Sequence, residues 1–153
     1  IPTPQAEFLR LLDIIGVPHE DHKQQYGEVL EIIGFEVDLP AMTIRMPKDA
    51  KASLVTAIRD FVSLKDHVQI PTPPTPRQQS LRSWLQILGY ANWALNVFPL
   101  LKPVLNSSYN KVAGRKFMSA LIYINKLARN DLLWFADQVE SLEGVRMLDT
   151  EEW

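Results

Sequence analysis

The chain has 153 residues, of which 46% are hydrophobic and 22% charged, as is usual for a globular protein of one domain or two small subdomains. It contains no cysteine, which excludes disulfides and cysteine-ligated metal sites, and no apolar run of about 18 residues that could cross a membrane. The N-terminal sequence IPTPQAEF lacks the features of a signal peptide and an initiator methionine, so we expect the chain to be a piece of a longer protein. We expect an intracellular location, in the cytoplasm or the nucleus, because a chain without cysteines is compatible with a reducing compartment.

The charge is unevenly distributed. The formal net charge of −2 differs from the basic balance that most free-standing nucleic-acid binders show. Residues 77–129, however, contain no Asp or Glu, and a stretch of this length without carboxylates favours a surface that faces a polyanion over an ordinary solvated face. The cations of this stretch are Arg77, Arg82, Lys102, Lys111, Arg115, Lys116, Lys126 and Arg129.

The first predicted element is a helix that begins at Thr3 and ends at Gly16. Thr3 is a capping residue, Pro4 suits the first helical turn, and glycine is a common helix terminator. The apolar residues recur at helical spacing: Phe8, Leu11, Leu12 and Ile15.

Two short strands are predicted next, over residues 29–39 and 42–46, with a tight turn around Pro40. We expect this hairpin to be the only β structure in the chain. Its facing apolar side chains are Ile32, Ile33, Phe35 and Val37 on one strand, and Ile44 and Met46 with Thr43 on the other.

A second helix is predicted to begin at Pro47, with Leu54, Val55, Ile58, Phe61 and Val62 on one face. Residues 70–76, IPTPPTP, then form a stiff and extended linker, because proline can donate to neither a helix nor a sheet.

Three further helices are predicted after the linker. The first begins at a capping box formed by Thr75, Pro76 and Gln78, and runs to about Val97 before Pro99. The second covers residues 103–112 and ends at Gly114. The third covers residues 119–142, and its apolar positions are Leu121, Ile124, Leu127, Ala128, Leu132, Phe135 and Val139.

The sequence His19-Glu20-Asp21-His22 is the one cluster with metal-ligand chemistry. A metalloprotease helix needs two histidines four residues apart on one face, whereas these are three apart in a loop. We therefore predict no metal site, and retain a small enzyme that uses this loop only as a third alternative. No Ser-His-acid motif or glycine-rich phosphate loop is visible.

The predicted helix after the linker carries a second group of candidate functional residues. Gly89 and Trp93 are four residues apart and share a face, with Asn92 beside them and Trp84 and Tyr90 nearby. Glycine inside a helix costs about 1 kcal/mol relative to alanine, which suggests that something approaches the backbone there. The alternative is helix–helix packing, with Trp93 in the core.

Residues 86–99, QILGYANWALNVFP, resemble the thumb helix of retroviral and retrotransposon reverse transcriptases. The resemblance implies that Gly89 and Trp93 enter the minor groove of the template–primer duplex, and Asn92 also matches the family pattern. Leu85 departs from it, since the retroviral pattern usually has glutamine there.

The resemblance continues on both sides, over residues 8–148. Gly34 and Phe35, within IIGFEV and ahead of MTIRMP, match the primer-grip hairpin that holds the 3′ end of the primer. Lys23 lies where these enzymes have a lysine that is a candidate proton donor to pyrophosphate. The segment ARNDLLWFADQVESLEGVRML resembles the lead into the RNase H domain of tyrosine-recombinase (DIRS-type) and related fungal retrotransposons.

The resemblance implies a mainly α fold, a helical bundle similar to the thumb and connection of these enzymes, with one small β-hairpin. The implied regions are the end of the palm with its primer-grip hairpin (1–46), a thumb helix (47–69), the proline-rich linker (70–76), further thumb helices (77–114), and a connection helix with a tail (115–153). The resemblance also implies that the intact enzyme is an RNA-directed DNA polymerase, whose catalytic aspartates hold two Mg²⁺ ions. Those aspartates are absent from this chain. We therefore expect the chain to need no cofactor and to be inactive alone.

The implied partner is an RNA–DNA or DNA primer–template duplex, with no membrane contact. Its phosphates would be contacted by Arg77, Arg82, Lys111, Arg115 and Lys116. The alternative is a retroelement-derived helical module that its host has retained for protein interactions as a homodimer through Trp84 and Trp93.

Overall fold

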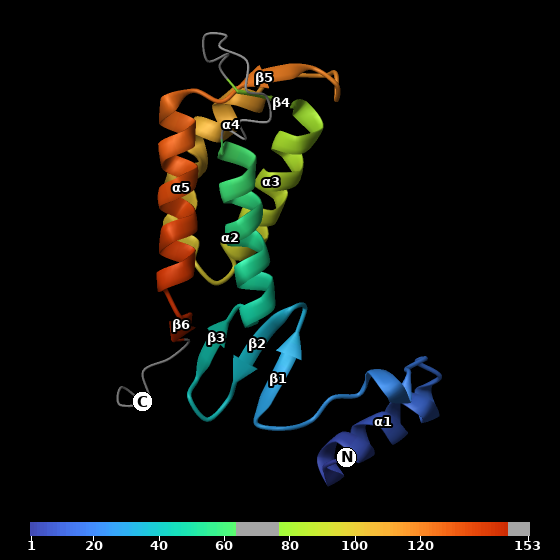
Figure 1. Cartoon of the computed structure of the whole chain (residues 1–153). Coiled ribbons are helices and arrows are strands. Elements are labelled where there is room, and N and C mark those ends of the chain that lie inside the picture. Colours follow the sequence, from blue (N-terminus) through green and yellow to red (C-terminus); the bar gives the residue numbers. More distant parts are fainter. Residues whose placement is uncertain (64–76, 147–153) are drawn as a thin grey trace.

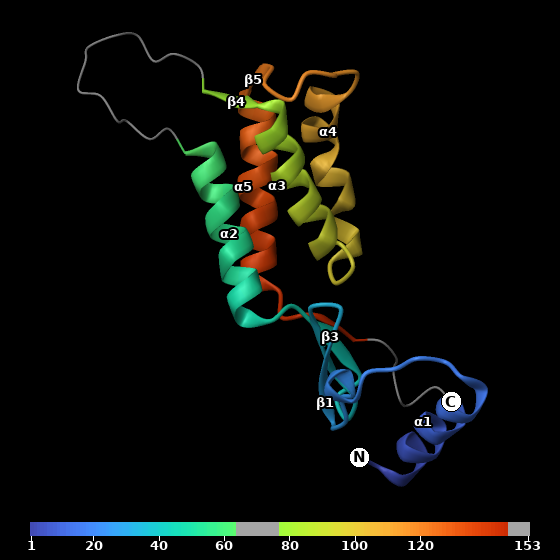
Figure 2. The ribbon, with the colours of Figure 1, turned by 90° about the vertical axis from the view of Figure 1, so that its right-hand side faces the viewer.

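The computed structural model describes residues 1–63 and 77–146 and shows a mainly α protein, as predicted (Figure 1). Three long helices stand side by side with a shorter helical segment, and a small sheet lies at each end of this bundle (Figures 1 and 2). The helices are α1 (Thr3–Ile15), η1 (Asp21–Lys23), α2 (Lys48–Val62), α3 (Leu81–Ala94), η2 (Pro99–Leu105), α4 (Asn106–Val112) and α5 (Lys126–Ser141). The strands are β1 (Val29–Ile32), β2 (Phe35–Asp38), β3 (Thr43–Arg45), β4 (Gln78–Ser80), β5 (Leu121–Tyr123) and β6 (Val145–Arg146).

The predicted two-stranded hairpin is wrong in detail, because the first of its strands is itself folded into a hairpin. β1 pairs antiparallel with β2 in a register that joins Ile32 to Phe35, which leaves Ile33 and Gly34 as a two-residue turn. Both turn residues have positive φ, 52° and 78°, as the tightest hairpin turn requires. An apolar isoleucine at a turn position made the segment look continuous. The sheet has the order β1-β2-β3-β6, and all its pairs are antiparallel.

The prediction that this hairpin is the only β structure is also wrong. β4 pairs with β5 at the other end of the bundle, between segments about forty residues apart in sequence. The two helices that follow these strands, α3 and α5, therefore begin later than predicted. Ser80 accepts from the backbone N–H of Ser83 at the start of α3, and Asn125 accepts from the backbone N–H of Ala128 at the start of α5. The predicted cap at 75–76 and the linker 70–76 lie outside the described residues.

The bundle core confirms the apolar face predicted for α2, since all five of its residues are buried. α2 packs mainly against α5, whose Leu132 and Phe135 are fully buried, and Trp84 of α3 meets Phe61 edge to face. The α5 prediction fails only at its start, where Leu121 belongs to β5 and Leu127 points to solvent. Burial of such side chains contributes about 1.5–3 kcal/mol each and is the main stabilising term of the bundle.

An ion-pair network joins the outer faces of α2 and α5. The guanidinium of Arg59 donates to Asp137, at 2.9 Å, and to Glu140. Hydrogen bonds to Glu140 and Asp137 raise the pKa of Arg59 above its ordinary value, so this cross-link stays charged at every pH at which the two carboxylates are ionised.

The first helix stands away from the bundle (Figures 1 and 2). α1 has the predicted bounds, and Gly16 ends it with φ 73°. Its apolar face is not covered, because Phe8, Leu11, Ile14 and Ile15 are all more than half exposed and only Leu9 is buried. No helix in the described ranges 1–63 and 77–146 is long and apolar enough to cross a membrane.

Candidate nucleic-acid interface

The turn between β1 and β2 packs directly against the C-terminal half of α3. The rings of Phe35 and Trp93 are stacked, with centroids 4.6 Å apart and an interplanar angle of 20°. A Cβ at Gly34 would lie 3.1 Å from Cζ2 of Trp93, so any other residue at this position would have to displace the indole by a few tenths of an ångström. The structure thus joins Gly34 and Phe35 to Trp93, residues that the sequence placed in two separate motifs.

Trp93 is half-buried and held from two sides. Tyr90 lies beside it, with ring centroids 5.9 Å apart, and the hydroxyl of Tyr90 donates to the carbonyl of Ala50 at 3.0 Å. Stacked aromatic pairs add about 0.5–1.5 kcal/mol beyond burial. The alternative that Trp93 serves packing is therefore correct in part, because one side of the indole packs against the protein. The other side is exposed to solvent, and the contacts with Phe35 and Tyr90 hold it in a fixed orientation.

One face of α3 is exposed along its whole length. Gly89 lies in the middle of this face, and a Cβ there would meet nothing within 4 Å. Leu85 is 42% exposed one turn before it, and Asn92 is exposed one turn after it, where its side-chain oxygen accepts from the hydroxyl of Tyr109 at 3.5 Å. No packing within the described residues accounts for a glycine at position 89, which leaves its backbone open to an outside partner.

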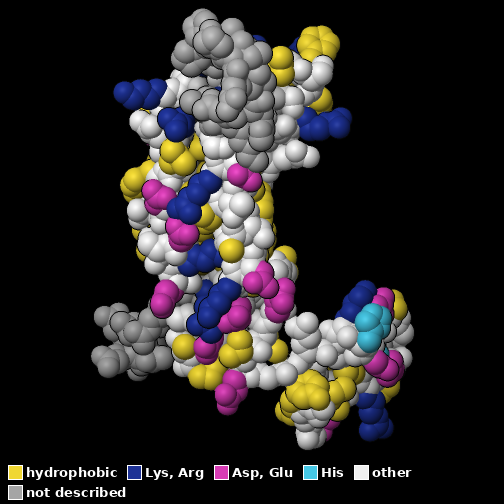
Figure 3. Space-filling view, in the orientation of Figure 1, with side chains coloured by type: hydrophobic (Ala, Val, Ile, Leu, Met, Phe, Trp, Pro, Cys, Tyr) yellow, Lys and Arg dark blue, Asp and Glu magenta, His cyan; other side chains and the backbone are white. Residues whose placement is uncertain are grey.

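The cations of the middle segment occupy different environments. Arg82, Arg115 and Lys116 are exposed and form no ion pair with any described residue, and Lys111 on α4 is half-buried and likewise unpaired. Arg77 is engaged, because its guanidinium donates to the carbonyl of Asp60 at 2.8 Å. Figure 3 shows Lys and Arg side chains beside hydrophobic ones at the end of the bundle that carries β4 and β5, with the Asp and Glu side chains farther along the visible face.

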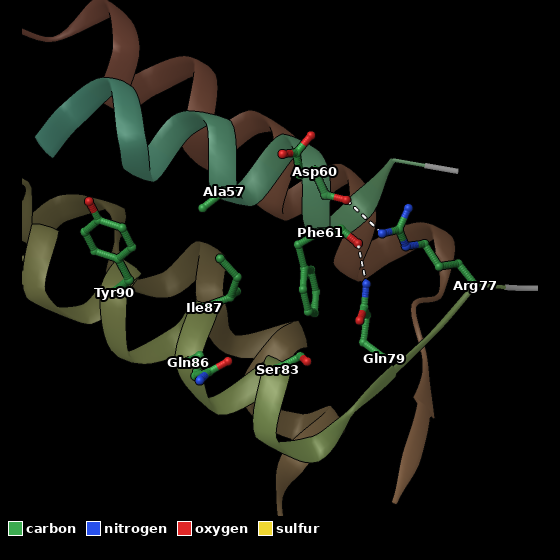
Figure 4. Close-up of a pocket in the computed structure, with 9 residues that line it drawn as sticks. All are labelled: Ala57, Asp60, Phe61, Arg77, Gln79, Ser83, Gln86, Ile87 and Tyr90. Carbon is green, nitrogen blue, oxygen red and sulfur yellow. Dashed lines mark hydrogen bonds between the residues drawn. The ribbon is translucent and has the colours of Figure 1, made fainter. Parts of the chain in front are cut away.

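Arg77 lines a groove of about 460 Å³ between α2, α3 and β4 (Figure 4). Gln79 donates to the carbonyl of Phe61 at 3.3 Å and, with Arg77, ties β4 to the end of α2. Phe61 and Ile87 form an apolar floor, and Tyr90 closes the far end. Because the guanidinium of Arg77 and the side-chain amide of Gln79 already bond to backbone carbonyls of α2, this groove offers few polar groups to a ligand.

The loop before β1 holds the other candidate residues. Lys23 pairs with Glu20 at 2.8 Å, and His22 lies 3.3 Å from the same carboxylate. His19 lies 3.6 Å from Asp13 and 3.7 Å from a second carboxylate, that of Asp21. Among the residues that the structure describes, no group of three or more His, Asp or Glu side chains could hold a metal ion, so the metal-enzyme alternative gains no support.

Two features of this region were not foreseen from the sequence. Phe117 is 79% exposed beside Lys116. The only feature of the sequence that indicated this exposure was the apolar pair Phe117-Met118 within a polar loop. Trp84 is fully buried in the bundle of the single chain, so it cannot belong to a dimer face unless the bundle opens.

The chain matches no protein-family model, and no curated protein matches it. The motifs, their order in the chain and the packing of the hairpin turn against α3 are therefore the features that bear on function.

Proposed function

We propose that this chain is the primer-grip and thumb region of a retroelement reverse transcriptase of the DIRS or a related fungal type. Its role is to bind the primer–template duplex, without catalysing nucleotide transfer itself. The observation that carries the proposal is the packing of the Gly34–Phe35 turn against Trp93, because it brings the two parts of the family pattern into direct contact, with Phe35 itself buried beneath the indole.

The exposed face of α3 suits the minor groove of an RNA–DNA hybrid, which is wide and shallow in A-like helices. Gly89 lets the helix backbone approach the sugar edges, since no side chain stands between them. Asn92 has donors and acceptors for 2′-hydroxyls and base edges, and Arg82 at the start of the same helix can contact phosphate. Trp93 is already immobilised by Phe35, so little side-chain entropy would be lost on binding.

The Mg²⁺ chemistry of an intact polymerase needs clustered carboxylates, and the described residues hold no such cluster. Lys23 is exposed and paired with Glu20, and its role as a proton donor stays a prediction about an intact enzyme.

The test is Gly89→Ala, measured against a labelled RNA–DNA hybrid by fluorescence anisotropy at low salt. Alanine meets no neighbour and removes the cost of glycine in a helix, so the variant should be up to ~1 kcal/mol more stable than the wild type. Its affinity for the hybrid should nevertheless fall about tenfold, because the added methyl group stands in the contact.

Asn130→Ala is the matched control, an exposed substitution on α5 away from this face, and should leave affinity unchanged. Wild-type protein that binds no hybrid at low salt would refute the proposal, as would equal affinity of Gly89→Ala and wild type.

A second candidate function is a helical interaction module that forms a homodimer. The exposed apolar face of α1, with Ile14 71% exposed, favours it, because such faces are rare on isolated monomers. Light scattering after size exclusion decides between the two. The second function is supported by a stable dimer that Leu11→Ser and Ile14→Ser each abolish. Addition of the RNA–DNA hybrid should not change the amount of this dimer.

A further inference from the structure

A groove of about 700 Å³ lies at the N-terminal end of α3, whereas Trp93 lies near the C-terminal end of the same helix. The loop 116–119 forms one wall and is fastened to the helix, because the backbone N–H of Arg82 donates to the carbonyl of Met118 at 3.0 Å. A second bond joins Leu81 to Ala120 at 2.9 Å. The groove is therefore built by the fold, and its size falls in the ~300–1,000 Å³ range of sites for small organic groups.

The groove carries positive charge without a counter-charge. Arg82 and Lys116 line it, Arg115 precedes it, and none of the three pairs with a carboxylate of the described chain. No Asp or Glu occurs anywhere between residues 77 and 129, so no acidic side chain of that stretch can neutralise it. Its charge is complementary to an anionic ligand.

The same groove carries an exposed aromatic ring. Phe117 is 79% exposed and Met118 49% exposed, although both line the groove. β5 continues this apolar surface, because Leu121 pairs with Ser80 of the groove wall and is 64% exposed, and Tyr123 follows on the same side of the strand at 50%. Single exposed apolar residues are ordinary, whereas an aromatic ring among unpaired cations is the composition of sites that stack bases and hold phosphates.

We propose that this groove binds unpaired nucleotides of a single-stranded nucleic acid, with a base stacked on Phe117 and adjacent phosphates held by Arg82 and Lys116. A ring this exposed can stack only on a base whose face is free, and inside a duplex both faces of each base are covered by their neighbours. The inference goes beyond the duplex grip and stands on a different feature, the groove with Phe117, although Arg82 contacts phosphate in both. If both hold, the substrate is a junction between a duplex and a single strand.

The experiment measures anisotropy of labelled oligo(rU) and oligo(dT) with the full chain over a salt series. Phe117→Ala should weaken binding about tenfold, and Phe117→Trp should preserve it, because stacking tolerates any aromatic ring. Arg82→Gln and Lys116→Gln should each reduce the salt slope by roughly 0.7, the loss of one phosphate contact to a single strand. Leu100→Ala, which truncates a 91% exposed side chain beyond the other end of α3, and Lys48→Gln, at an exposed position at the start of α2, are controls that should change neither quantity.

The outcomes separate this inference from the duplex proposal. Phe117→Ala should spare binding of a blunt hybrid, and Gly89→Ala should spare binding of oligo(rU). The inference is overturned if folded wild-type protein does not bind either oligonucleotide at low salt. It is also overturned if Phe117→Ala binds as wild type, if polyglutamate competes as well as oligo(rU), or if Phe117→Ala acts only by abolishing a dimer.

Discussion

Substitution of Gly34 by alanine tests the contact that unites the hairpin with α3. Gly34 has φ 78°, in the left-handed region where a residue with a Cβ pays about 1–2 kcal/mol. The new Cβ would also lie 3.1 Å from Cζ2 of Trp93, closer than an ordinary van der Waals contact. Gly114 is the matched control, because its φ is 72° and a Cβ there meets nothing within 4 Å.

We expect Gly114→Ala to lower the free energy of unfolding by about 1–2 kcal/mol, through backbone strain alone. Gly34→Ala should lower it by roughly 1 kcal/mol more, since the indole must move off Phe35 and a stacked pair is worth about 0.5–1.5 kcal/mol. Urea unfolding followed by far-ultraviolet circular dichroism measures both values, with an unchanged slope as the check that unfolding stays two-state.

A double-mutant cycle assigns the extra cost to the ring. In a Trp93→Leu background the smaller side chain, which has no ring at the position of Cζ2, should leave room for the new methyl group, so the excess cost of Gly34→Ala should largely disappear. Equal destabilisation by Gly34→Ala and Gly114→Ala would refute the reasoning, since the indole would then yield freely. An excess that persists without Trp93 would show that another neighbour causes it.

The remaining predictions use the same unfolding assay. Asn125→Ala should destabilise by about 1 kcal/mol because it removes the cap bond to the N–H of Ala128 (2.9 Å), and Asn125→Asp should retain stability; equal losses from both would show that the cap is not the cause. Ser108→Ala should raise stability by roughly 1 kcal/mol, because this buried hydroxyl finds no partner among the described residues, and a loss of stability would reveal one. Leu132→Ala should cost about 2–5 kcal/mol by leaving a cavity, whereas Leu127→Ala on the exposed side of the same helix should stay within about 0.5 kcal/mol; similar effects at both sites would contradict the packing of α5.

Local patterns were enough to predict the elements whose signals lie within one helix. The apolar spacing of Leu54, Ile58 and Phe61 predicted the buried face of α2, because a helix in contact with a core must repeat at that period. Gly16 predicted the C-terminal end of α1 correctly, whereas the predicted cap Thr3 is the first helical residue and makes no cap hydrogen bond, because Pro2 occupies the cap position. The apolar residues of α1 recur at the same spacing, yet most of them are exposed, since periodicity marks an amphipathic helix but not the presence of a partner.

The strands at the two ends of the bundle could not be predicted in this way. β4 and β5 are three residues each, and neither has a pattern of its own; they exist because α3 and α5 bring their preceding segments together. The turn at Ile33–Gly34 was missed for a related reason, because only the pairing of β1 with β2 distinguishes it from a continuous strand.

Composition and local patterns were sufficient to predict the helical character of the chain, the acid-free stretch 77–129 and the two motifs that resemble a primer grip and a thumb. How these residues are used depends on contacts between distant segments. The tertiary structure stacked Phe35 on Trp93, left Gly89 open, tied Arg77 to Asp60 and placed the exposed Phe117 beside free cations. The physical reason is that composition and spacing set what a side chain can do, whereas contacts between distant segments set which side chains are buried and which remain free to bind.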